Sequence, residues 1–170
     1  MATWLPILAI LLITGSFMWL KPSPRDQFLA KLRAKALTQG FRLGSLRVPD
    51  TSDYGRVKER FQMVTLYSLP LQLAAGPSCR FTVLRTSGEA GTYLPEGWAW
   101  DERQGLSETQ YEQLHRVLTS LPASIQLISL SSGSISLNWD EKDPEMSFER
   151  MRAMLVDVAQ VAQQELIAAS

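Results

Sequence analysis

The stretch from Ala2 to Leu20 holds nineteen residues without a single charged side chain. As an α-helix it would be roughly 28 Å long, close to the thickness of the hydrocarbon core of a bilayer. Trp4 and Trp19, near its two ends, carry the amphipathic rings that favour the headgroup level. The sequence therefore predicts a transmembrane anchor at residues 1–20.

Two other structures remain possible for this stretch. A cleaved signal peptide would need basic residues before the apolar run and small residues at a cleavage site. Here no basic residue precedes the run, and Phe17-Met18-Trp19-Leu20 occupy the place of the small residues. A buried core helix would usually be shorter and apolar on one face only. The flanks and the length favour the anchor.

The basic residues next to the anchor all follow it. They are Lys21, Arg25, Lys31, Arg33 and Lys35, with Asp26 as the one acid among them. Because Lys and Arg accumulate on the cytoplasmic side of a membrane span, we expect the N-terminus outside and the long C-terminal part in the cytoplasm. The same five side chains are candidates for contact with lipid headgroups.

A basic helix is predicted at residues 21–40. Ser23-Pro24 has the form of a helix start, and Gly40 that of a helix end. Phe28, Leu29, Leu32 and Ala36 share one side of this helix. The helix lies on the membrane surface in one interpretation, and is the first helix of the soluble domain in the other.

The charge of the chain is zero overall but unevenly distributed. Residues 1–60 carry ten Lys and Arg against four Asp and Glu, whereas residues 61–170 carry seven against thirteen. A basic part beside the anchor suits an anionic membrane surface. A folded part without a basic face argues against nucleic acid as a partner.

The residues that usually carry catalysis or bind metals are scarce. His115 is the only histidine and Cys79 the only cysteine, so neither a structural zinc site nor an internal disulfide can form. Cys79 is expected to be a small buried apolar residue. The acidic residues at 140–145 lack the spacing of a calcium loop. We expect no catalytic, cofactor-binding or metal site.

The rest of the chain, residues 41–170, predicts one α+β domain. Alternation of apolar and polar residues favours five strands, at residues 41–48 with a bulge at Gly44-Ser45, and at 57–69, 80–86, 125–130 and 135–139. A helix follows the capping box that begins at Ser107, and Gly133 marks a hairpin. Strands grouped before and after a helix predict a mostly antiparallel sheet covered by helices.

The last helix has the strongest periodicity in the domain. Asp143 is expected to cap it, with Pro144 in its first turn. Apolar residues then recur every three or four positions over five turns, at Phe148, Met151, Leu155, Val158, Ala162 and Leu166. This helix is expected to pack along its whole length.

The segment from Tyr93 to Glu102 concentrates large aromatic side chains. Trp98 and Trp100 are two residues apart, so they point the same way if the segment is extended. Together with Tyr93 they are candidates for contact with a protein partner, because Trp and Tyr are common at interface hot spots. The alternative is that the two Trp side chains plug one end of the sheet.

Three motifs resemble a set of small, uncharacterised single-pass proteins of the bacterial inner membrane. They are Lys21-Pro22-Ser23-Pro24-Arg25 after the anchor, Leu94-Pro95-Glu96-Gly97-Trp98 in the domain, and Trp139-Asp140-Glu141 at the end of a strand. The first forty residues are also similar in topology to YajC-like accessory subunits of the preprotein translocase. The resemblance implies a cytoplasmic domain tethered to the inner membrane, and it points to no particular activity.

Three functions are compatible with this sequence. The first is a non-catalytic accessory or scaffold protein of an inner-membrane complex, which binds membrane lipid and a membrane-protein partner. The second is a sensor of the lipid surface that works through the basic helix. The third is an enzyme whose site the sequence does not reveal. The first is our expectation.

Overall fold

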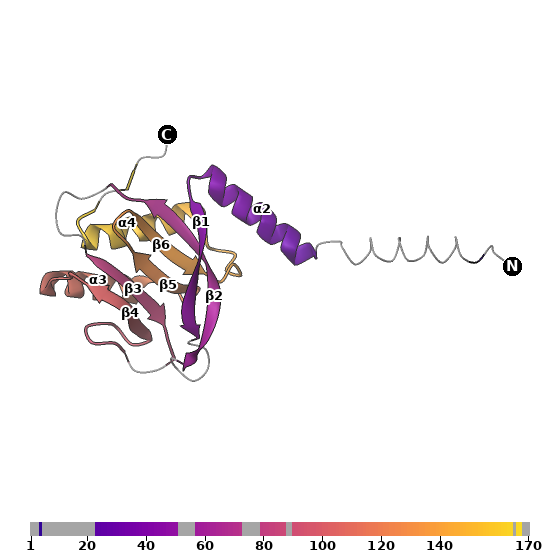
Figure 1. Cartoon of the computed structure of the whole chain (residues 1–170). Helices are drawn as coiled ribbons and strands as arrows, with labels where there is room; N and C mark the ends of the chain where they lie inside the picture. Colours follow the sequence, from indigo (N-terminus) through magenta and orange to yellow (C-terminus); the bar gives the residue numbers. More distant parts are fainter. Residues whose placement is uncertain are drawn as a thin grey trace. The chain divides into compact units, whose positions relative to one another are not determined.

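The computed structural model describes residue 4 and residues 23–50, 57–72, 79–87, 90–164 and 166–167. The chain divides into two compact units, Met1–Ala34 and Lys35–Ser170. The second unit is an α+β domain built on one antiparallel sheet, as the strand pattern predicts (Figure 1).

The described helices and strands follow one another in this order: α2 (Pro24–Thr38), β1 (Arg42–Asp50), β2 (Val57–Pro70), β3 (Arg80–Arg85), β4 (Trp98–Gln104), α3 (Glu108–Ser120), β5 (Ile125–Leu130), β6 (Ser134–Trp139) and α4 (Phe148–Val161). In space the strands are ordered β1-β2-β6-β5-β3-β4, and every neighbouring pair is antiparallel. β1 and β4 are therefore the two edges of the sheet.

One face of the sheet forms the main core with α3 and α4. Leu137 of β6 lies opposite both Tyr67 of β2 and Ile128 of β5, and residues directly opposite in an antiparallel pair point to the same face. All three side chains are buried. The two helices pack against each other, and α4 packs on β6 (Figure 1). Leu114 and Leu118 of α3 and Met151, Leu155 and Val158 of α4 supply their buried sides.

The opposite face is concave because the sheet curls. Val48 near the end of β1 packs against Leu84 of β3 and Leu127 of β5, although three strands lie between β1 and β3 in the sheet. Leu46, Val64 and Leu66 of the β1–β2 hairpin complete this small apolar cluster. The hairpin therefore bends over the concave face.

The last turn of α2 belongs to the domain. Ala36 is buried, and the helix ends in a Schellman motif in which Gly40 has φ +82° and Phe41 N donates to Ala36 O. Arg152 of α4 donates to Gln39 O at 2.6 Å. At the other end of the helix, hydrogen bonds from Ser23 lower the pKa of the Asp26 carboxyl.

Several details of the sequence prediction are wrong. The sheet has six strands among the described residues rather than five, because Trp98–Gln104 forms β4. Residues 42–49 pair regularly with β2, and the bulge lies between Pro49 and Asp50 rather than at Gly44-Ser45. The hairpin with Gly133 and the capping box of Ser107 are confirmed.

The last helix is shorter than its periodicity suggests. Its N-cap is Ser147, whose hydroxyl accepts from Arg150 N, rather than Asp143. Asp143 instead closes a preceding turn by accepting from Glu145 N. The helix ends at Val161, because Gln163 takes φ +56°. Leu166 then forms an isolated antiparallel bridge with Leu71, so it is not part of the helix.

The predicted anchor lies, apart from Trp4, outside the described residues, as does Lys21. Within the part of the chain that the structure describes, no helix combines the length and the apolar character that crossing a bilayer requires. The anchor therefore stays a prediction from the sequence.

The central position of Leu137 leads to a test of this core. We expect Leu137→Ala to lower the free energy of unfolding by about 2–5 kcal/mol, because it leaves a cavity between sheet and helices. Leu37→Ala is the matched control, since Leu37 is 56% exposed, and should change stability by less than about 0.5 kcal/mol. Urea unfolding of the full chain in detergent measures both, and equal effects would contradict this packing.

Candidate functional site

The sheet splits where β2 leaves β6. β2 pairs with β1 from Val57 to Ser68, but with β6 only from Tyr67 to Pro70. Beyond Trp139 the chain continues along β5, where Asp140 N donates to Ser124 O. Along its N-terminal half, β2 therefore pairs with β1 on one side and with no described strand on the other side.

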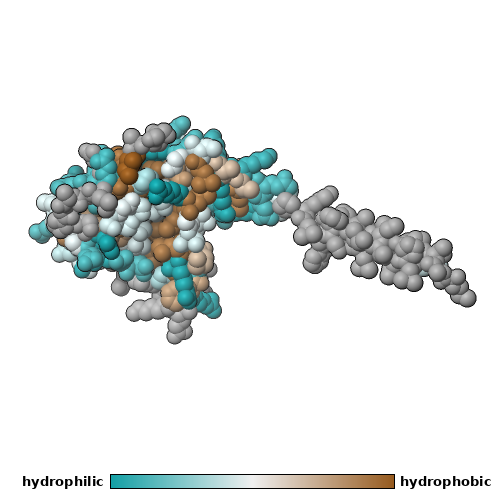
Figure 2. All heavy atoms as spheres, turned by 45° about the horizontal axis from the view of Figure 1, so that its top comes forward, coloured by the Kyte–Doolittle hydropathy of each residue, from teal (hydrophilic) through white to brown (hydrophobic). Residues whose placement is uncertain are grey.

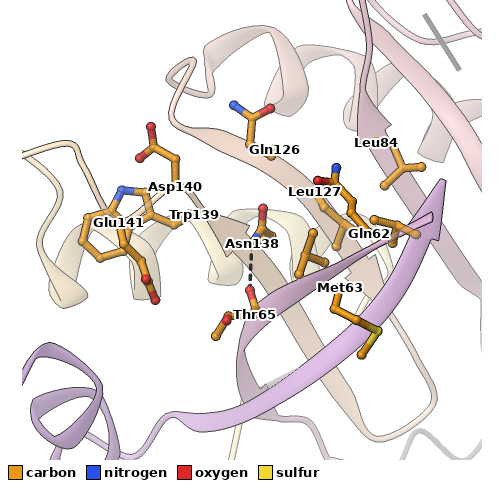
Figure 3. A pocket seen from close by; sticks show the side chains of 12 residues that line it. Gln62, Met63, Thr65, Leu84, Gln126, Leu127, Asn138, Trp139, Asp140 and Glu141 are labelled. Carbon is orange, nitrogen blue, oxygen red and sulfur yellow. Dashed lines mark hydrogen bonds between the residues drawn. The ribbon is translucent and has the colours of Figure 1, made fainter. Parts of the chain in front are cut away.

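Asn138 sits at the vertex of this split. Its Nδ2 donates to Thr65 O at 2.8 Å, which replaces the backbone bond that two paired strands would make. A carbonyl oxygen only accepts hydrogen bonds, so this contact fixes which end of the amide is nitrogen. The Oδ1 end points away from Thr65 (Figure 3).

The Asn138 amide is only half satisfied by the protein. The residue is 8% exposed, and none of the described residues donates to its Oδ1. Oδ1 is nevertheless open to solvent, because the buried side-chain atoms without a partner among the described residues are Trp139 Nε1 and Gln164 Oε1. The unsatisfied buried group of a residue beside the cavity is therefore a donor, the Trp139 indole N–H, and such a group carries a desolvation cost of about 1–3 kcal/mol.

A cavity of about 310 Å³ occupies the split, and we call it the β2–β6 cleft (Figure 3). Its apolar lining comes from the cluster on the concave face together with Met63 and Trp139, and its polar lining from three amide side chains, Thr65 and two carboxylates. The lining residues are Val48, Gln62, Met63, Val64, Thr65, Leu84, Gln126, Leu127, Asn138, Trp139, Asp140 and Glu141. The only charged side chains among them are the two acids.

Hydrogen bonds hold the two carboxylates, those of Asp140 and Glu141, in place. Glu141 Oε1 accepts from the buried Tyr67 hydroxyl at 2.7 Å, and Glu141 has φ +56°. Asp140 Oδ1 accepts from Lys142 N at 3.0 Å. Each carboxylate has two oxygens, and each oxygen can accept more than one hydrogen bond. Together with Asn138 Oδ1 they make the cleft rich in acceptors.

A second candidate site surrounds β4. Tyr93 stacks on Tyr111 of α3 with 4.9 Å between ring centroids, and Trp100 meets Tyr111 edge-on at 5.9 Å. The Arg103 guanidinium lies over both Trp100 and Tyr111. We call these four residues the aromatic cluster. A shallow hollow of about 180 Å³ beside it is lined by Tyr93, Tyr111 and His115, and by the acids Glu108 and Glu112.

The backbone at Tyr93 is unusual for a bulky residue. Tyr93 has φ +68° in the turn closed by Leu94 N donating to Gly91 O. Such a conformation favours Gly or Asn and costs a bulky residue on the order of 1 kcal/mol. Gly91 has no room for a side chain, because a Cβ there would lie 2.9 Å from Trp100. The loop thus holds Tyr93 in a strained backbone conformation, and the residue is 57% exposed.

The structure separates the three aromatic residues predicted as a partner contact. Tyr93 is exposed and Trp100 is half-buried, and Trp100 Nε1 donates to Thr92 O. Trp98 is 1% exposed and lies beneath the Arg85 guanidinium. Arg85 donates to the carbonyls of Leu121, Pro122 and Ile125, and burial lowers its pKa. Trp98 therefore closes one end of the sheet, and only Tyr93 and Trp100 reach the surface.

The predicted headgroup contacts that the structure describes all lie on α2. Arg25, Lys31 and Lys35 are exposed and Arg33 is half-buried. Phe28 on the same helix is exposed as well. The positions of these side chains do not test binding to lipid, so their contact with headgroups stays a prediction.

The other residues considered for chemistry are dispersed. His115 is exposed on α3, whereas Cys79 is buried, which raises the pKa of its thiol. Across the described ranges, no three His, Cys, Asp or Glu side chains are grouped to hold a metal ion. Cys79 is therefore the small buried residue that the sequence suggests.

Sequence reasoning missed the β2–β6 cleft. One signal was present, since Asn138 is a polar residue between two apolar ones in a buried strand. Nothing in the sequence, however, places Gln62 and Asn138 around one cavity, because their proximity depends on where the pairing of β2 and β6 ends.

The hydrogen bond from Asn138 Nδ2 to Thr65 O leads to a prediction. We expect Asn138→Ala to lower the free energy of unfolding by about 1–3 kcal/mol, since Thr65 O loses a buried donor. Gln126→Ala, on the exposed rim of the cleft, is the control and should stay within about 0.5 kcal/mol of the wild type. Urea unfolding compares the two, and a neutral Asn138→Ala would mean that the bond to Thr65 contributes nothing.

Known proteins offer no guide to either site. Comparison of the chain with protein-family models, with curated proteins and with solved structures finds no match. The chain's own residues are therefore the basis for its function.

Proposed function

We propose that this chain is a non-catalytic accessory protein, anchored in a bacterial inner membrane, whose α+β domain binds a larger membrane-protein complex. The observation that carries this proposal is the aromatic cluster, which joins the edge strand β4 to the loop before it and to α3. The next paragraphs give the physical reasons for it.

The cluster has the composition of an interface hot spot. Trp, Tyr and Arg are the residues most enriched at such positions, and here they contact one another on the surface. Tyr93 also keeps a strained backbone conformation with its ring exposed. Because strain of this kind persists mainly where function requires it, the exposed ring favours a role in binding.

The position of the aromatic cluster in the fold is a second argument for a role in binding. β4 is an edge of the sheet, and its residues from Asp101 to Gln104 are exposed. The charged side chains of Asp101, Glu102 and Arg103 discourage indiscriminate pairing of that edge with other chains. A partner of matching charge can still dock there, so the edge favours selective rather than general association.

The predicted anchor brings the domain close to proteins of the same membrane. The charge-free residues 2–20 followed by basic residues support a single span with the domain in the cytoplasm. A tether raises the concentration of the domain near membrane partners without any new contact. Apolar residues reach the domain surface among hydrophilic ones in Figure 2, which suits a protein that binds through limited patches.

Partner capture tests the cluster. The variant Tyr93→Asn/Arg103→Ala removes the exposed ring and the guanidinium, and Asn suits the left-handed backbone at position 93. We expect recovery of partners from native membranes in mild detergent to fall about tenfold, the effect of losing roughly 1.4 kcal/mol. Fold stability should change little, because relief of strain offsets the lost stacking.

The control for this capture is Ile167→Ala, which removes an exposed apolar side chain elsewhere. Mass spectrometry compares wild type, variant and control at native abundance. If the wild type is recovered alone, or if the variant captures as much as the control, the accessory function is wrong.

Membrane extraction tests the tether. We expect the full chain to stay with the membrane pellet in alkaline carbonate, because an apolar span is held by lipid rather than by surface charge. A reporter active only outside the cytoplasm should be inactive when fused after Ser170. Mature protein that starts after Trp19, or that carbonate releases, would contradict the anchor.

A further inference from the structure

We infer that the hollow beside the aromatic cluster binds one arginine side chain of the partner protein. We call it the tyrosine hollow, and its lining residues are Tyr93, Glu108, Tyr111, Glu112 and His115. This inference rests on the proposed accessory function, because it names the chemistry of the partner at the aromatic cluster. Three features of the hollow carry it.

The first feature is a stripe of side chains along one face of α3. Relative to Glu108, the other members of the stripe stand three, four and seven positions on, at Tyr111, Glu112 and His115. Residues four apart on a helix have Cβ atoms about 6 Å from each other. Because a guanidinium carries several N–H donors in one plane, a single arginine can reach the carboxylates of both Glu108 and Glu112.

The second feature is that no described cation contacts these two carboxylates. Glu108 and Glu112 are exposed, and within the described part of the chain their side chains form neither an ion pair nor a hydrogen bond. Arg116, one turn further along α3, lines a different hollow together with Asp157. A cation that a partner brings therefore meets two carboxylates that the described residues leave without an opposite charge.

The third feature is the exposed ring of Tyr93. One face of this ring stacks on Tyr111 at an interplanar angle of 16°, and the residue is still 57% exposed, so its other face is open to a ligand. The face of an aromatic ring is negative and attracts cations. The cluster already shows this attraction, since the Arg103 guanidinium lies 5.6 Å from the centre of the Tyr111 ring.

The size of the hollow and its mixed lining favour arginine over lysine. Its volume of about 180 Å³ is roughly six times the volume per water molecule in the liquid, which suits the end of one side chain rather than a whole peptide. A guanidinium is planar, so it can stack on the Tyr93 ring while its edge donates to carboxylates. An ammonium group is a compact point charge and cannot stack in this way.

Nuclear magnetic resonance of the full chain in uncharged detergent tests this inference. The probe is the blocked tripeptide N-acetyl-Gly-Arg-Gly-amide, and the signals are those of the Tyr93 and Tyr111 rings. We expect both signals to shift with millimolar affinity. The same tripeptide with citrulline keeps the planar shape but lacks the charge, so it should bind at least about fivefold more weakly. Unshifted ring signals or equal binding of the citrulline tripeptide would overturn the inference.

Two double variants of equal charge change separate the hollow from general electrostatics. Glu108→Gln/Glu112→Gln should weaken binding of the arginine tripeptide about fivefold, because each exposed pair contributes little by itself. Glu145→Gln/Glu149→Gln is the matched control, since it alters two exposed acids that are also four positions apart but lie outside the lining. Tyr93→Asn should weaken binding about threefold through the lost cation–π contact. Equal losses in the two double variants would overturn the inference.

Capture of partners from native membranes distinguishes this inference from the proposed function. We expect Glu108→Gln/Glu112→Gln to recover about fivefold less partner than Glu145→Gln/Glu149→Gln. If the wild type recovers partners and the two variants recover equal amounts, the inference is wrong and the proposed function stands. If the wild type is recovered alone, the proposed function is wrong, and the tripeptide titration still decides whether the hollow binds arginine.

Discussion

The hydrogen bond from Asn138 Nδ2 to Thr65 O stands where the sheet ceases to be continuous. On one side of it, β2 and β6 are joined by backbone bonds, and on the other side they separate. The separation lets the β1–β2 hairpin bend until Val48 packs on Leu84. The concave cluster and the cleft beside it thus arise from the same event, the early end of one strand pairing.

The two faces of the sheet are stabilised in different ways. The helix face carries large apolar side chains, whereas the concave face carries a row of hydroxyls across four strands, in which Ser68 bonds Ser136 at 2.8 Å and Thr82 bonds Ser129 at 2.9 Å. Hydroxyl pairs add little net stability, about 0.5–1.5 kcal/mol each. The concave face is therefore the weaker one, and its apolar cluster secures the hairpin above it.

Periodicity predicts the parts of this fold that bury one clear face. It finds five strands and the helices α2, α3 and α4, because their apolar residues recur at intervals of two, three or four. It misses β4, since Asp101, Glu102 and Arg103 on a sheet edge break the alternation. It misplaces the start of α4, since Asp143-Pro144 and Ser147 are both plausible caps and only tertiary contacts decide between them. Periodicity does not predict the β2–β6 cleft, because the walls of the cleft come together only through the register of the strand pairing.

Two residues depart from the local rules that the rest of the domain follows. Trp139 places an indole N–H without a hydrogen-bond partner in a buried strand, and Tyr93 places a bulky side chain in a left-handed turn. Each departure costs on the order of 1 kcal/mol, and a smaller or more compatible residue would avoid it. Departures of this kind are expected where binding rather than folding selects the residue. Trp139 lines the cleft and Tyr93 lies on an exposed loop, so both departures stand beside places on the surface where binding, rather than packing, accounts for the residue.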